Sequence, residues 1–192
     1  MTEVGVSGRR NPLERDILDK AALYIHGKNG DYLEAGQYKK NCPGFDMFGI
    51  DYRVDLPWIA CEQIQAAYDR IRGRYDRLYV IANSVGAYFT MASLWDRNIE
   101  KALFISPVLD MEQLIRGMMD RAGISEAGLR EKKEIRIGFG ETLSWEYLCF
   151  VREHPITWDI PTEILYGGDD DLVPRQTVDR FVHDHKAGLT VM

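Results

Sequence analysis

The segment 78–94 contains the serine whose surroundings best fit a nucleophile. An apolar run leads into Ala-Asn-Ser-Val-Gly at 82–86 and then directly into a helical pattern. A serine on a sharp strand-to-helix turn holds its hydroxyl above the sheet, and this turn needs small residues two positions before and after it. We predict that Ser84 is a nucleophile and that the Val85 amide helps to bind an oxyanion. The plainer interpretation, in which Ser84 only caps the helix, does not explain the small neighbours.

A second candidate element is the loop that follows the apolar run 21–26. It begins at His26 and continues as Gly-Lys-Asn-Gly at 27–30. A glycine-bearing loop at a strand end can bring a second backbone amide to an oxyanion, although a plain glycine turn gives the same pattern. We predict Lys28 as that donor, with Asn29 as the next choice. His26 is expected to orient the loop by hydrogen bonding rather than to act as a base.

Three consecutive carboxylates, Asp169–Asp171, follow the apolar run 162–167 and precede a helix that starts at Pro174. A carboxylate at this place could orient a histidine and stabilise its imidazolium form. Two alternatives remain open. Acidic residues favour helix N-termini, which would account for Asp171, and clustered carboxylates bind Mg²⁺, as in a metal-dependent phosphatase. Because no P-loop or second carboxylate pair accompanies them, we expect neither a metal nor a cofactor.

Short apolar runs alternate with longer amphipathic segments along the chain. The predicted strands are 21–26, 46–52, 78–82, 102–107, 162–167 and 189–192, and the predicted helices are 31–40, 57–72, 84–95 and 174–186. Apolar runs of this length are typical of parallel strands buried on both faces. The alternation predicts an α/β domain with a mostly parallel central sheet flanked by helices on both faces. Residues 1–19 are expected to form a tail, with a short helix over 12–18.

The interval between the fourth and fifth predicted strands is unusually long. It holds 54 residues, and its pattern predicts three helices over 111–121, 125–137 and 142–153. Ligands of α/β sheets bind beyond the carboxyl ends of the strands. We therefore expect an insert over about 109–158 to fold over the site as a helical cap, with most of its large apolar side chains packed against the core.

The three strand-end segments, in this order, resemble the α/β-hydrolase superfamily. The matching pieces are HG-x-x-G at 26–30, A-N-S-V-G at 82–86 and G-x-x-D-x-x-V-P at 167–174, and the resemblance covers residues 21–192. It implies a single domain over 20–192 that lacks the first one or two strands of the family and carries a helical cap. It also implies Ser84 as the nucleophile, Asp170 as the acid, and the backbones of Val85 and Lys28 as the oxyanion hole.

The resemblance further implies a histidine after the last strand, because the triad follows the chain order Ser, acid, His. The last predicted strand ends at Met192, and the four histidines are His26, His154, His183 and His185. We expect that the sequence is part of a longer chain whose base follows Met192, so that these 192 residues alone would be nearly inactive. A hydrolase-like protein without the base, and substitution by another histidine, are the alternatives that stay open.

Composition and charge narrow the class of function. The chain has a net charge of −6 and no basic run, which argues against nucleic-acid binding. Its three cysteines, Cys42, Cys61 and Cys149, form no metal-binding or disulfide pattern, which indicates reduced thiols in the cytoplasm. No apolar run approaches the roughly 20 residues that span a bilayer, so no membrane partner is expected.

These observations predict a serine hydrolase that acts on a carboxylic ester or a similar acyl bond of a small molecule. The alternative is a catalytically inactive binding protein that keeps the same fold. The sequence predicts neither the substrate's identity nor the oligomeric state.

Overall fold

The computed structural model describes residues 20–192, so the expected tail 1–19 and its short helix over 12–18 lie outside the described residues. Six strands form one central sheet in the order β2-β1-β3-β4-β7-β8. The strands are β1 (Lys20–Ile25), β2 (Asp46–Gly49), β3 (Arg77–Asn83), β4 (Lys101–Ile105), β7 (Thr162–Tyr166) and β8 (Gly188–Val191). Every neighbouring pair is parallel, which confirms the predicted α/β architecture.

The register of the central strands brings their carboxyl ends to one level. Ile25 of β1 pairs with Ala82 of β3, and Asn83 pairs with Ile105 of β4. Five of the six residues of β1 are buried, as expected for a strand covered on both faces. The segments that follow β1, β3 and β4 therefore leave the sheet side by side.

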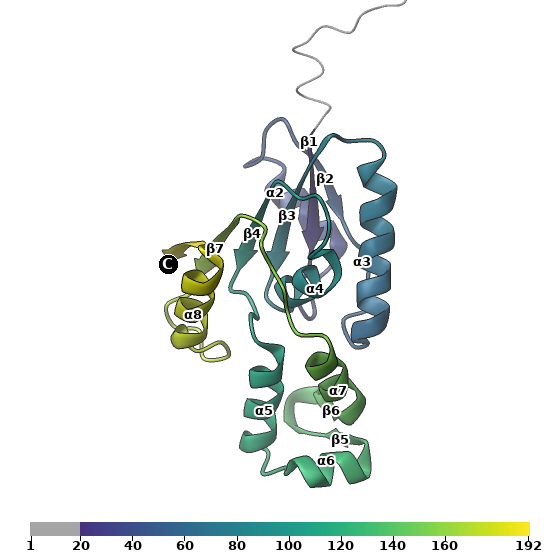
Figure 1. Cartoon of the computed structure of the whole chain (residues 1–192), viewed down its shortest axis with the longest axis vertical. Helices are drawn as coiled ribbons and strands as arrows, with labels where there is room; N and C mark the ends of the chain where they lie inside the picture. The colour runs from purple at the N-terminus through teal and green to yellow at the C-terminus, as the bar shows by residue number, and fades with distance from the viewer. Residues whose placement is uncertain (1–19) are drawn as a thin grey trace, which may run out of the picture.

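Three helices cover one face of the sheet, as Figure 1 shows: α3 (Pro57–Arg72), α4 (Val85–Leu94) and α8 (Arg175–His185). On the other face, the short 3₁₀ helix η1 (Tyr32–Glu34) and α2 (Ala35–Tyr38) pack on β1 and β2. The predicted helix 31–40 is thus two short pieces, in which Asp31 caps η1 and Gly36 weakens α2. No helix of residues 20–192 combines the length and apolarity needed to cross a membrane.

The chain between β4 and β7 forms a separate layer beyond the carboxyl ends of the strands (Figure 1). Its elements are α5 (Met111–Arg121), α6 (Glu126–Lys132), β5 (Glu134–Arg136), η2 (Gly138–Gly140), β6 (Thr142–Ser144) and α7 (Trp145–Glu153). We call this layer the cap. The predicted helices 125–137 and 142–153 were too long, because the chain turns at Lys133, with φ 66°, and forms an antiparallel β5–β6 hairpin.

One arginine ties the three cap helices together. Arg152 of α7 donates to Glu112 of α5 at 2.8 Å and to Glu126 of α6 at 2.7 Å. The Arg152 guanidinium holds the pKa of the Glu126 carboxyl below its ordinary value. The return to the sheet is fixed by buried Trp158, whose indole N–H donates to Thr162 Oγ1 at 2.8 Å. The three cap helices are therefore bonded to one another, and the segment that leads from the cap back to β7 is held in place by Trp158.

Candidate active site

Ser84 occupies a strained turn between β3 and α4. Its φ is 53° and its ψ −121°, which an L-residue rarely adopts. The turn is held by its neighbours, since the Ser84 amide donates to Ile105 O at 2.9 Å and its carbonyl accepts from Val108 at 3.0 Å. Such strain persists only where the surroundings enforce it, and it is concentrated at functional sites. The Ser84 side chain does not cap α4 and has no hydrogen-bond partner within residues 20–192, so the N-cap interpretation is wrong.

The small residues around Ser84 are explained by close backbone contacts. A Cβ atom on Gly86 would lie 2.5 Å from the carbonyl oxygen of Ile25 and 2.6 Å from that of His26. Ala82 is completely buried. The turn therefore presses against the end of β1, where no larger side chain fits.

Gly86→Ala is expected to destabilise the fold by about 2 kcal/mol, because the new Cβ would meet backbone that cannot easily move. Chemical denaturation gives the free energy of unfolding. Gly117→Ala on α5 is the matched control, since its Cβ would have only Arg121 Nη1 within 4 Å, at 3.7 Å. That change should be neutral or slightly stabilising. Equal effects of the two changes would contradict the tight turn.

The two predicted oxyanion donors lie on either side of this turn. Gly27 borders the serine so closely that a Cβ on it would lie 3.2 Å from Ser84 Cβ. The loop closes through a hydrogen bond from Gly30 N to Gly27 O at 3.1 Å. The backbone amides of Val85 and Lys28 have no hydrogen-bond partner in the described part of the chain. Two unpaired N–H groups thus remain near the serine.

His26 orders the loop, as its position in the sequence predicts. Its Nδ1 lies 2.8 Å from Gly27 O, and its ring packs on Tyr52 with 4.5 Å between centroids. The Tyr52 hydroxyl donates to His26 O at 2.5 Å. The His26 side chain is therefore buried in structural contacts rather than directed at Ser84.

Asp170 is the one member of the acidic cluster that is both half-buried and held in place. Its Oδ1 accepts hydrogen bonds from the amides of Leu172 at 2.9 Å and Val173 at 3.0 Å. The other carboxylate oxygen has no partner within residues 20–192. Gly168 N donates to Met192 O at 3.1 Å, so the carboxyl end of β8 lies beside the Asp170 loop.

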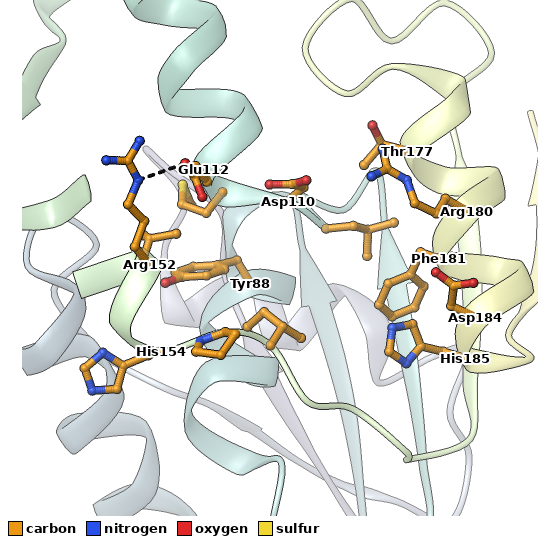
Figure 2. A pocket seen from close by; sticks show the side chains of 15 residues that line it. Tyr88, Asp110, Glu112, Arg152, His154, Thr177, Arg180, Phe181, Asp184 and His185 are labelled. Atoms are coloured by element: carbon orange, nitrogen blue, oxygen red, sulfur yellow. Dashed lines mark hydrogen bonds and ion pairs between the residues drawn. The ribbon is translucent and has the colours of Figure 1, made fainter. Parts of the chain in front are cut away.

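No histidine is hydrogen-bonded to Ser84 or Asp170 in the described structure. His154 Nδ1 lies 2.8 Å from Phe150 O, and His185 Nδ1 lies 2.6 Å from Trp158 O. His183 is exposed beside Asp184. In Figure 2, His154 lies on the cap side of a pocket and His185 on its α8 side. Thus each histidine has a structural partner or faces solvent, and none completes a triad.

Comparison with known proteins identifies the architecture. No protein-family model matches the chain, and no curated protein matches its sequence. Among solved structures, the alpha/beta hydrolase domain-containing protein 10 from mouse matches with a TM-score of 0.61 and 16% identity, over 90% of this chain and 78% of that one. This chain has the α/β-hydrolase fold.

Two further structures of this fold show the same likeness. A proline iminopeptidase-related protein from Thermus thermophilus has a TM-score of 0.58 and 16% identity, over 92% of this chain and 81% of that one. An esterase from Pyrococcus furiosus has a TM-score of 0.51 and 18% identity, over 91% and 73%. The α/β-hydrolase fold predicted from the three strand-end segments is thereby confirmed.

A pocket of about 300 Å³ opens between the base of the cap and α8 (Figure 2). The start of α5, the end of α7 and the inner side of α8 line it, together with the ring of Tyr88 from α4. Ser84 is not among the lining residues, so this pocket does not include the Ser84 turn. The sequence did not reveal it, because its walls come from four distant segments and no local pattern marks them.

Two phenols, of which Tyr88 is buried and Tyr147 partly buried, lie where α4 and the cap meet. Burial raises the pKa of both Tyr88 and Tyr147 above the ordinary value, so both remain neutral hydrogen-bond donors at neutral pH. The Tyr88 hydroxyl is fully enclosed and has no partner in the described residues. No local sequence pattern marks this pair, because the two residues lie on elements that meet only in the folded chain.

Cys61 of α3 is expected to resist alkylation. Burial raises the pKa of its thiol to about 11 from an ordinary value of 9.0. At pH 8 this leaves roughly a hundredfold less reactive thiolate than an unperturbed cysteine would have. Peptide mapping after a short iodoacetamide pulse should show Cys61 modified last among the three cysteines. Early modification of Cys61 would contradict the raised pKa of its thiol.

The alternative of a metal site at Asp169–Asp171 gains no support from the geometry. Within residues 20–192, no three or more His, Cys, Asp or Glu side chains gather closely enough to hold a metal ion. Asp169 and Asp171 are exposed, whereas Asp170 points at backbone amides. In the described structure, the three carboxylates therefore have different surroundings.

Proposed function

We propose that the protein is a serine hydrolase that acts on a carboxylic ester or a similar acyl bond of a small molecule. The observation that carries this proposal is the Ser84 turn, with its φ of 53° and its unpartnered hydroxyl. A strained serine at the carboxyl edge of a parallel sheet is where this fold exposes a nucleophile. The esterase from Pyrococcus furiosus shows that proteins with this fold carry out such chemistry.

In the proposed reaction, Ser84 Oγ attacks the carbonyl carbon as a base removes its proton. The amides of Val85 and Lys28 stabilise the oxyanion that forms. The base then protonates the leaving alcohol, and water attacks the acyl-enzyme to release the acid and free Ser84. Asp170 orients the base and stabilises its positive charge through its free carboxylate oxygen.

The base in this reaction is the histidine that the order of the triad puts after the last strand. Support comes from β8, whose end is bonded to Gly168, two residues from Asp170. A residue just beyond β8 would emerge beside that loop. The free thiols of the three cysteines support a cytoplasmic location.

A second candidate function is ligand binding without catalysis. The observation in its favour is that all four histidines lack a hydrogen bond to Ser84 and Asp170 within residues 20–192. The pocket between the cap and α8 would then be the functional site. This candidate predicts binding that does not change when Ser84 is replaced.

A turnover assay separates these functions. p-Nitrophenyl esters of increasing acyl length are offered with imidazole as a replaceable base, and p-nitrophenyl phosphate is offered with Mg²⁺. Serine chemistry predicts turnover of esters that EDTA does not inhibit, and no turnover of the phosphate. Phosphate turnover that requires Mg²⁺ would favour the metal alternative, whereas no turnover of either would favour binding alone.

A further inference from the structure

The loop that carries Lys28 is bonded to the cap by one ion pair. The Lys28 ammonium donates to the carboxylate of Glu141, although the two residues are 113 positions apart. The Lys28 side chain is half exposed, at 50%, and the Glu141 side chain is less exposed, at 30%. Within residues 20–192, no other hydrogen bond or ion pair joins loop 27–30 to the cap. The contact therefore links the loop after β1 to the cap.

On the core side, the ion pair is formed by Lys28, whose backbone amide is a predicted oxyanion donor. Loop 27–30 is closed by the Gly30–Gly27 hydrogen bond, and Asn29 has a positive φ of 59°. The Lys28 amide is unpartnered within the described chain and lies one residue from Gly27, which packs against Ser84. The Lys28 side chain is bonded to the cap, so a direct link runs from the cap to the loop that carries this amide.

On the cap side, Glu141 is attached to a firm support. Ile137 N donates to Glu141 O at 2.9 Å, which closes the hairpin end between β5 and β6. The strand β6 then leads directly into α7, whose first turn is capped by Ser144 through Tyr147 N at 3.3 Å. Glu141 is therefore joined to α7 by a short, hydrogen-bonded segment.

We propose that Glu141 is a positioning residue that acts through Lys28. When the cap closes, Glu141 fixes loop 27–30 so that the Lys28 amide faces the oxyanion formed at Ser84. The proposal rests on the proposed function, because it assigns the Lys28 amide to transition-state stabilisation. It couples closure of the cap to assembly of the oxyanion hole.

The expected loss of kcat on replacement of Glu141 is small, because the Lys28–Glu141 ion pair is partly exposed to solvent. Exposed ion pairs are weak and are screened by salt. Loss of a whole oxyanion donor costs about a hundredfold or more in kcat. Loss of a residue that only steadies the donor is expected to cost about three- to fivefold in kcat, with KM almost unchanged.

The test compares ester hydrolysis, with imidazole present, by the wild type, Glu141→Gln and a charge swap, Lys28→Glu with Glu141→Lys. Glu141→Gln should lower kcat about three- to fivefold, and the swap should restore most of it. High salt should lower kcat in the wild type but not in Glu141→Gln. Glu134→Gln is the matched control and should change nothing, since Glu134 is exposed on β5 and forms no ion pair with any described residue.

Hydrogen exchange of peptides covering 27–31 supplies a readout that does not need activity. Faster exchange in Glu141→Gln, but not in Glu134→Gln, together with the lower kcat, supports the proposal. Unchanged exchange, or faster exchange with unchanged kcat in an active enzyme, overturns it. If the wild type hydrolyses no ester, the proposed function fails and the positioning role falls with it, while faster exchange would still show that the cap and loop are linked.

Discussion

Imidazole in solution is expected to raise ester hydrolysis by this protein about tenfold or more, and to have no such effect on Ser84→Ala. A positioned general base contributes about 10²–10⁴-fold, and a diffusing base can recover part of that. The rise should increase with pH as the neutral form of imidazole becomes more abundant, because only that form accepts a proton. Initial rates of a short p-nitrophenyl ester, corrected for imidazole without protein, provide the measurement.

The control for this prediction is Ser93→Ala on the same helix. Ser93 is buried and donates to Phe89 O at 2.5 Å, so its replacement removes a hydroxyl from α4 without touching the turn. It should keep the imidazole-dependent rate. Because members of a triad act as a unit, Ser84→Ala without imidazole should have only a small effect. An equal response to imidazole in wild type and Ser84→Ala would contradict the nucleophile assignment.

Asp170→Asn is expected to remove most of the imidazole-dependent rate, by about tenfold, because the amide cannot stabilise an imidazolium cation as a carboxylate does. Asparagine keeps a side-chain oxygen for the amides of Leu172 and Val173, so the loop should remain folded. The measurement is the same initial rate, compared over a range of imidazole concentrations.

The neighbouring acids provide the comparison for Asp170. Asp169→Asn and Asp171→Asn make the same change in charge, but both residues are exposed. They should retain the imidazole-dependent rate within about twofold, since surface charges in water interact weakly. If all three variants lose activity to the same extent, the loss is caused by the change in net charge of the loop, and Asp170 has no distinct role.

The sequence predicted correctly the elements whose residue types are required by their immediate neighbours in the chain. The elbow at 82–86 follows from the need for small residues where a strand meets a helix, and contacts of Gly86 with β1 show why. The helix 57–72 was predicted with the bounds that α3 has, because Pro57 starts it and a regular apolar face continues to Ile71. In both segments one strong local signal agrees with the tertiary environment.

The cap hairpin could not be predicted in the same way. β5 and β6 are three residues each, too short for alternation to be distinguished from a helical pattern. Strong helix formers in 126–134 extended the predicted helix past Lys133, where the chain in fact turns with a positive φ. The conformation of this segment is set by the pairing of β5 with β6 rather than by helix propensity. A pattern within either strand alone does not show that pairing.

The candidate site was also only partly predictable. Motifs in the sequence indicated Ser84 and the acidic loop as candidates, whereas the hydrogen-bond partners of the histidines depend on how the chain packs. His185 lies against Trp158 O and His154 against Phe150 O, contacts that no spacing indicates. The Lys28–Glu141 pair was equally hidden, since it joins residues 113 positions apart.

Mapping the site of fluorophosphonate attachment tests the central claim most directly. The probe forms a covalent bond with a serine that is activated for attack, and digestion followed by mass spectrometry locates it. With imidazole present, the adduct is predicted on Ser84, and Ser84→Ala should carry none while Ser93→Ala is modified as the wild type is. An adduct on another residue, or none on a protein that remains folded by circular dichroism, would contradict the assignment of Ser84 as the nucleophile.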